Sequence, residues 1–67
     1  MIELTITGSD KKIFVNTDKI AWIVEDERFK PGTKIHMDDN SIVYAEEDIM
    51  EVMQKIVNDR FGIGGEQ

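Results

Sequence analysis

The chain has no cysteine, one histidine and one proline among its 67 residues. The absence of cysteine excludes a disulfide, a thiolate metal site and a cysteine nucleophile. A domain this short buries only about 60% of the surface that its unfolded chain exposes, so such domains usually need a disulfide, a metal or a partner. Packing or self-association must therefore stabilise this chain, and we expect a homodimer.

Basic residues are also scarce, since eight lysines and arginines stand against fourteen acidic residues and the formal net charge is -6. Proteins bind nucleic-acid backbones by neutralising phosphates with Lys and Arg, so nucleic acid is not an expected partner. No apolar run approaches the ~20 residues of a membrane span, and the first residues lack a signal-peptide pattern. We expect a cytoplasmic protein with no membrane span.

Five short segments have the composition and alternation of β-strands. The first alternates strictly between apolar and polar residues, and the others are runs rich in β-branched and aromatic residues between turn residues. The predicted strands are residues 2–7, 12–16, 20–25, 33–38 and 41–44.

The third predicted strand is apolar on both faces, because Ile20, Trp22 and Val24 alternate with Ala21 and Ile23. Such a strand is either central in a sheet or covered by another chain. We therefore select Ile23, together with Phe14 of the preceding strand, as candidates for self-association. Trp22 and Tyr44 are assigned either to the core or to an interface.

Residues 49–60 are expected to form the only helix, because apolar residues recur there at intervals of three and four. Asp48 precedes this stretch and Glu51 comes three residues later, a pattern typical of a capping box. Gly62 is placed to end the helix. The side chains predicted to face the core are Ile49, Val52, Met53, Ile56, Val57, Arg60 and Phe61.

These elements predict an α+β fold: a small, antiparallel, five-stranded curved sheet, open and barrel-like, with one C-terminal α-helix across its open end. We expect a single domain at residues 1–61 and a flexible Gly-rich tail at residues 62–67. The predicted core residues are Ile2, Leu4, Ile6, Val15, Ile20, Trp22, Ile35, Met37, Ile42, Val52, Met53 and Ile56.

No group of residues has the pattern of a catalytic, cofactor-binding or metal-binding site. His36 has Asp38 two residues away, but a metal site needs three or four converging ligands. Ser9 and Ser41 fall in predicted turns, and His36 is the only histidine that could activate them. The sequence therefore predicts a surface histidine, no cofactor and no enzyme activity.

Acidic residues gather around the predicted 38–41 turn and the start of the helix, where they suit a solvated turn and the helix dipole. One aromatic residue, Phe29, stands among charges in the loop at residues 25–33, either folded over the core or exposed as an anchor for a partner. The candidate partner-binding residues are Asp38, Asp39, Glu46, Glu47, Glu51 and Phe29, with Asp48 in the same acidic group.

Four stretches of the chain have a pattern known from one family. Residues 1–5 read Met-Ile-x-Leu-Thr, and residues 13–25 read Ile-Phe-Val-Asn-x-Asp-x-Ile-x-x-Ile-x-Glu. Residues 33–37 read Thr-Lys-Ile-His-Met, and residues 48–56 read Asp-Ile-x-Glu-Val-x-x-Lys-Ile. In these stretches the chain resembles the small FlbD or SwrD family of bacterial flagellar-operon proteins over nearly its whole length.

The resemblance implies a non-enzymatic accessory protein that is associated with flagellar motility and motor force and that binds another protein. Similar short chains occur in phage genomes. Three features depart from the family pattern: a longer loop at residues 26–32, an Asp-Asp-Asn turn at residues 38–40 and a more acidic balance. They leave open an alternative, a phage-encoded acidic protein that binds and blocks a basic surface of a host defence or nucleic-acid-handling protein.

The two hypotheses predict different surfaces. One continuous negative face would favour the acidic blocker, because such a field steers a protein toward a basic partner. Dispersed acidic residues with an exposed apolar patch around Phe29 or Ile23 would favour the accessory protein. The chain is also similar to the RNA-binding regulator CsrA in its opening residues and element order, but the net charge of -6 argues against RNA.

Overall fold

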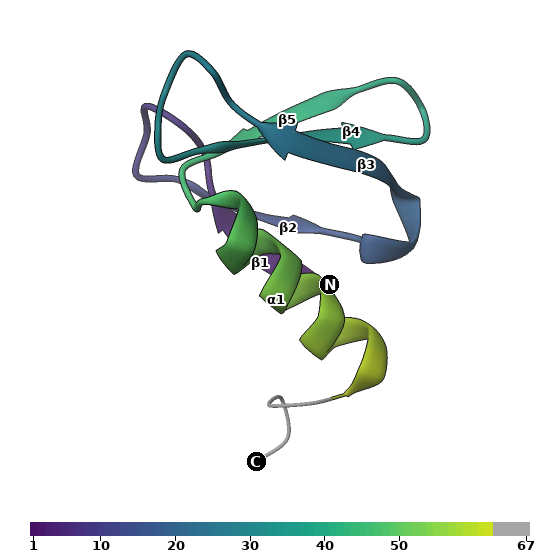
Figure 1. Ribbon diagram of the computed structural model, residues 1–67. Helices are drawn as coiled ribbons and strands as arrows, with labels where there is room; N and C mark the ends of the chain where they lie inside the picture. The colour runs from purple at the N-terminus through teal and green to yellow at the C-terminus, as the bar shows by residue number, and fades with distance from the viewer. Residues whose placement is uncertain (63–67) are drawn as a thin grey trace.

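A computed structural model describes residues 1–62. These residues form five strands and one α-helix, arranged as in Figure 1, which confirms the α+β class. Residues 63–67, most of the predicted tail, lie outside the described residues. Within residues 1–62, no helix is long and apolar enough to cross a membrane. The elements are β1 (Ile2–Thr5), β2 (Lys12–Val15), the 3₁₀ turn η1 (Thr17–Lys19), β3 (Ile20–Glu25), β4 (Thr33–Met37), β5 (Ile42–Ala45) and α1 (Ile49–Phe61).

Strands β1 and β2 form the predicted hairpin, with Ile2 opposite Val15 on its buried face. The amide of Ile6 donates to the carbonyl of Lys11 at 2.9 Å and closes the turn. Gly8 lies in this turn with a φ of 79°, which glycine adopts without the steric cost that a Cβ brings. Strand β1 therefore ends at Thr5, two residues before the predicted end.

Strands β3, β4 and β5 form an antiparallel sheet with β4 in the middle. The turn between β4 and β5 contains no glycine, and Asn40 takes the positive φ of 74° that Asn tolerates better than most residues. The carboxylate of Asp39 accepts bonds from the hydroxyl of Ser41 at 2.6 Å and from its amide at 2.9 Å. These bonds hold the pKa of Asp39 below its ordinary value.

The five strands are divided between these two sheets, so the predicted single five-stranded sheet is not confirmed. One isolated bridge connects the two sheets, between Ile6, which follows β1, and Ala45 of β5. The ladder does not extend along β1 because the amide of Thr5 donates to the Glu47 carboxylate, at 2.9 and 3.1 Å, where a continuous ladder would use a backbone carbonyl. A side chain thus ends the pairing between β1 and β5 that would be needed to join the two sheets into one.

Strand β3 contains a β-bulge at Ala21. Ile20 pairs with Met37 and Trp22 pairs with His36, so Ala21 has no residue opposite it. An extra residue moves every following side chain to the other face of the strand. The prediction that Ile20 and Trp22 share one face is therefore wrong, and Trp22 is 54% exposed.

The core lies between the two sheets and α1, and its buried apolar residues are Ile2, Leu4, Val15, Ile35, Ala45 and Val52. Three further predicted core residues, Ile20, Met37 and Ile56, are partly buried against this cluster. Three predicted core residues are exposed instead: Trp22, Ile42 and Met53. Trp22 and Ile42 lie outside because both pair with His36, on the outer face of the three-stranded sheet.

Helix α1 begins at the predicted cap, since the carboxylate of Asp48 accepts a bond from the Glu51 amide at 2.8 Å. The reciprocal bond from the Asp48 amide to the Glu51 side chain does not form within residues 1–62, so only half of the predicted capping box is present. Gly62 ends the helix with a φ of 68°, and its amide donates to the carbonyl of Asn58.

The second half of α1 is held to η1 and to the N-terminus. Asp59 accepts a bond from the Met1 ammonium at 2.8 Å and from the Thr17 hydroxyl at 2.7 Å, and both bonds keep the pKa of Asp59 below its ordinary value. The guanidinium of Arg60 donates to the carbonyl of Thr17 at 3.0 Å. Polar contacts therefore orient this part of the helix, where the prediction placed Arg60 on the apolar face.

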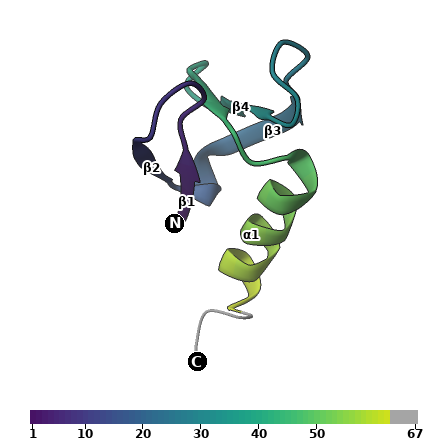
Figure 2. The same cartoon turned by 90° about the vertical axis from the view of Figure 1, so that its left-hand side faces the viewer.

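The opposite side of α1 is covered by no other element of the described chain. Figure 2 shows the strands on one side of the helix and above it. Val52 is the only fully buried residue of α1, and several residues predicted to face the core are exposed. The exposed apolar residues, which we call the outer helix stripe, are Met50, Met53, Val57 and Phe61.

Candidate protein-binding face

The outer side of the three-stranded sheet gathers aromatic and cationic side chains in an acidic chain. Cross-strand pairing places Trp22, His36 and Ile42 in one row, and Val24, Lys34 and Tyr44 in the next row. Successive rows on one face of a sheet are about 7 Å apart. Together with the neighbouring 26–32 loop these rows form the aromatic face, which we define as Trp22, Arg28, Phe29, His36, Ile42 and Tyr44.

Trp22 and His36 stack on each other in the first row. Their ring centroids are 3.6 Å apart and their planes differ by 6°. The stack positions the indole of Trp22 on the surface although no core surrounds it. His36 is therefore a half-buried side chain on the outer face of the sheet that supports an aromatic neighbour.

Arg28 extends the face from the 26–32 loop. Its guanidinium carbon lies 4.3 Å from the ring centroid of Tyr44 and 5.3 Å from that of Phe29, distances at which a cation is attracted to an aromatic ring. The other side of Arg28 is held by Asp26, which is fully buried. The Asp26 carboxylate accepts bonds from the Arg28 amide at 3.0 Å, from its Nε at 3.3 Å and from Nη2 at 3.5 Å.

The contacts between Asp26 and Arg28 shift the pKa of both groups. The side-chain bonds to Arg28 lower the pKa of Asp26 despite burial, and the same bonds raise the pKa of Arg28. The amide of Asp26 donates to the carbonyl of Gly32 at 3.0 Å and closes the loop. A Cβ at Gly32 would overlap the carbonyl oxygen of Phe29, so this tight loop requires glycine there.

An apolar groove continues the aromatic face around β5. It is lined by Ile6, Thr7, Ile13, Ile42, Val43 and Tyr44, and so shares two residues with the face. The hydroxyl of Thr7 is buried and has no hydrogen-bond partner within residues 1–62. A buried hydroxyl without a partner is costly and uncommon, so a bound segment that supplies one polar group to Thr7 would be favoured here.

The acidic candidates do not form one face. Asp38 and Asp39 lie in the β4–β5 turn, whereas Glu46 and Glu51 lie near the start of α1, at the other end of β5 (Figure 1). Strand β5 has four residues, or about 13 Å of extended chain. The structure thus separates the acidic residues into two groups and leaves an aromatic surface between them.

Glu47 has a structural role, because both its carboxylate and its backbone carbonyl accept hydrogen bonds from strands β1 and β4. Partial burial raises the pKa of its carboxyl, but bonds from the amide and the hydroxyl of Thr5 outweigh burial and leave the pKa below its ordinary value. The backbone carbonyl of Glu47 also accepts a bond from the buried hydroxyl of Thr33 at 2.7 Å. Glu47 therefore positions the start of α1, and its carboxylate is already occupied by Thr5.

Comparison of the chain with protein-family models, curated proteins and solved structures finds no match. The geometry of the surface, together with the resemblance noted above, must therefore support any functional proposal.

The apolar candidates differ in exposure. Phe14 is 65% exposed on the outer side of the β1–β2 hairpin, opposite Glu3. Ile23 is partly buried against the core, because the bulge turns it inward. Phe29 is 51% exposed beside Arg28, which matches the anchor alternative better than a side chain folded over the core.

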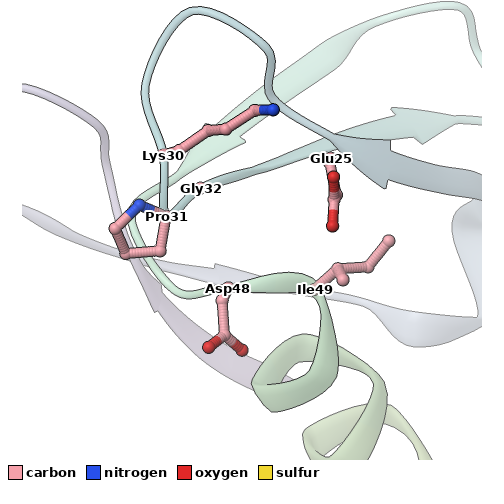
Figure 3. A pocket seen from close by; sticks show the side chains of 6 residues that line it. All are labelled: Glu25, Lys30, Pro31, Gly32, Asp48 and Ile49. Atoms are coloured by element: carbon pink, nitrogen blue, oxygen red, sulfur yellow. The ribbon is translucent and has the colours of Figure 1, made fainter.

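A second opening lies between the 26–32 loop and the start of α1 (Figure 3). It is lined by Glu25, Lys30, Pro31, Gly32, Asp48 and Ile49. The carboxylate of Asp48 is occupied as the helix cap, and Glu25 and Lys30 are the other ionisable residues. In the described part of the chain, no three His, Cys, Asp or Glu side chains converge on a metal position.

Sequence reasoning missed Arg28 as a member of the site and left Trp22 between core and interface. Arg28 follows Asp26 by two residues, a spacing at which an Asp side chain commonly accepts a bond from a backbone amide. That signal was available in the sequence. The position of Tyr44 under the guanidinium depends on the pairing of β4 with β5, and no local pattern reveals it.

Proposed function

We propose that this protein is a non-enzymatic accessory module of bacterial flagellar motility that binds another protein through the aromatic face. The observation that supports binding is the cluster formed by exposed Trp22 and Arg28 with half-buried Tyr44, on and beside the outer side of the three-stranded sheet. Trp, Tyr and Arg are the residues most enriched among those that dominate binding energy at protein interfaces. The flagellar context rests on the family resemblance alone.

The rigidity of the face supports a specific partner. Trp22 is held by the stack with His36, and Arg28 is held by Asp26 and by two aromatic rings. Side chains that are ordered before binding lose less conformational entropy when a partner docks. The partner that fits is a protein surface with an apolar segment for the groove and one polar group for Thr7.

A competing proposal is the acidic blocker of a basic host surface. Its support is the net charge of -6, which would steer the chain toward a basic protein. The separation of the acidic groups along β5 and the commitment of Glu47 to Thr5 favour the aromatic face instead. We further propose a cytoplasmic location and a homodimer.

The test is capture of partners from the native bacterial host by the wild-type chain and by Trp22→Ala, at low and high salt. Flagellar basal-body or export proteins should bind the wild type, bind the variant at least about 10-fold less, and resist salt. Phe14→Ala is the matched control, because it removes an exposed aromatic residue elsewhere. The acidic blocker would be supported, and our proposal refuted, by a different result. In that result the chain captures a basic nucleic-acid enzyme, high salt releases the enzyme, and Trp22→Ala captures it as well as the wild type does.

A further inference from the structure

The outer helix stripe is a second exposed apolar surface, separate from the aromatic face. Met50 is 68% exposed and Phe61 is 72% exposed, with Met53 and Val57 between them. Their spacings of three, four and four residues place all four on one side of α1. A continuous apolar side of this length on a helix is typical of an interface.

The charge around the stripe distinguishes it from the rest of this acidic chain. Two uncharged residues, Gln54 and Asn58, border it and bond to each other at 3.0 Å. Asp59 and Arg60 are both engaged with Thr17 on the inner side of the helix. Two copies of a chain with a net charge of -6 repel each other, so they can associate only where little negative charge meets.

The stripe is also complementary to itself. When two copies of α1 lie antiparallel around a two-fold axis, Met50 of one lies opposite Phe61 of the other, and Met53 opposite Val57, because both pairs are centred on nearly the same point of the helix. Antiparallel helices also place opposite ends of their dipoles together. In a parallel pair, Met53 would meet Met53 and the dipoles would oppose.

We infer that the outer helix stripe binds a second copy of this chain, as an antiparallel helix pair in a symmetric dimer. The inference rests on the proposed homodimer and assigns its interface to α1 in place of Phe14 and Ile23. The small buried core of the protomer gives such a dimer a physical reason, since chains of this size gain stability by association.

The test uses sedimentation equilibrium of the full chain and of three variants. The wild type should have twice the 7.7 kDa mass of the chain at micromolar concentration. Met53→Lys and Val57→Glu should each raise the dissociation constant about 100-fold, because each dimer would bury two unpaired charges. Both variants should fold normally by circular dichroism, since both side chains are exposed in the protomer. Phe14→Lys, the control, should remain a dimer.

Mixing the two helix variants decides the orientation. In an antiparallel pair of Met53→Lys with Val57→Glu, the two new charges meet and the other contact stays native, so the mixture should recover a dimer of one copy of each. A parallel pair offers no such match. No recovery would refute the antiparallel arrangement. A wild-type dimer that both helix variants leave intact would refute the helix interface but not the dimer, and a monomeric wild type would refute both.

Discussion

The outer sheet surface and the outer helix surface are both apolar, but their side chains are held in different ways. On the aromatic face, each anchor has a fixed neighbour: Trp22 stacks on His36, and Arg28 is clamped between Asp26 and Tyr44. The outer helix stripe instead presents the flexible side chains of Met50 and Met53 and the exposed ring of Phe61, and no aromatic stacking or side-chain hydrogen bond within residues 1–62 holds them.

This difference indicates two kinds of recognition. A preorganised face of Trp, Arg and Tyr suits one partner of matching shape, because its geometry is set before binding. Methionine side chains adapt to the surface that they meet, so a Met-containing stripe suits packing against an identical copy. The proposed partner surface is thus preorganised, whereas the proposed dimer surface is adaptable.

The largest expected effect comes from Gly32→Ala, which would disrupt the aromatic face and leave the outer helix stripe unchanged. The new Cβ overlaps the carbonyl oxygen of Phe29, so the 26–32 loop must shift and release Arg28. We expect a loss of about 3 kcal/mol in the free energy of unfolding, measured with urea, and loss of partner capture. Gly8→Ala is the control: it also changes a turn glycine, with a φ of 79° but free space, and should cost about 1 kcal/mol. Equal losses in the two variants would refute the clash at Gly32.

The next largest effect is expected from a comparison of the two sides of α1, in which the same change, Val to Ala, is made on each side. Val52→Ala removes fully buried methyl groups and should lower the free energy of unfolding by about 2 kcal/mol. Val57→Ala, five residues along the same helix, should change the free energy of unfolding by less than about 0.5 kcal/mol. The protein concentration in this measurement is kept below the dissociation constant of the dimer. Similar values for the two variants would mean that both sides of α1 are buried in the protomer.

The smallest change in the free energy of unfolding is expected when the Asp26 carboxylate loses its charge. The bonds from Arg28 lower its folded-state pKa below 3.8, so the stabilisation is complete above the unfolded-state value and is lost as pH falls through the folded-state value. Asp26→Asn should therefore show a shallower decline in stability on acidification below about pH 4. Helix pairing involves no carboxylate of the stripe, so Asp26→Asn should leave the dimer unchanged. An acid profile identical to the wild type would contradict the clamp.

The order and type of the elements could be predicted from the sequence. Alternation in β1 and the three-four spacing in α1 are local patterns, and the predicted strands at 20–25 and 33–38 and the predicted helix agree with the structure to within one residue at each end. The cap at Asp48 and the glycine at the helix end are equally local signals. These features depend only on neighbouring residues.

The faces could not be predicted, because they depend on distant contacts. The bulge at Ala21 exchanges the two faces of β3 for the residues that follow it, and so places Trp22 on the outer face. It is visible only in the pairing of β3 with β4. The Glu47 carboxylate ends the β1–β5 ladder from 42 residues away in the chain. Helix α1 has apolar residues on two sides, and spacing alone does not say which side meets the sheets.

The bulge also affects how the molecule resists aggregation. Strand β3 lies at the edge of the three-stranded sheet, where unpaired backbone groups invite another chain to add a strand. A regular added strand needs an even row of donors and acceptors, and the extra residue at Ala21 breaks that row one residue after β3 begins. The irregularity that exposes Trp22 thus also interrupts the edge along which copies of the chain could stack into a continuous sheet.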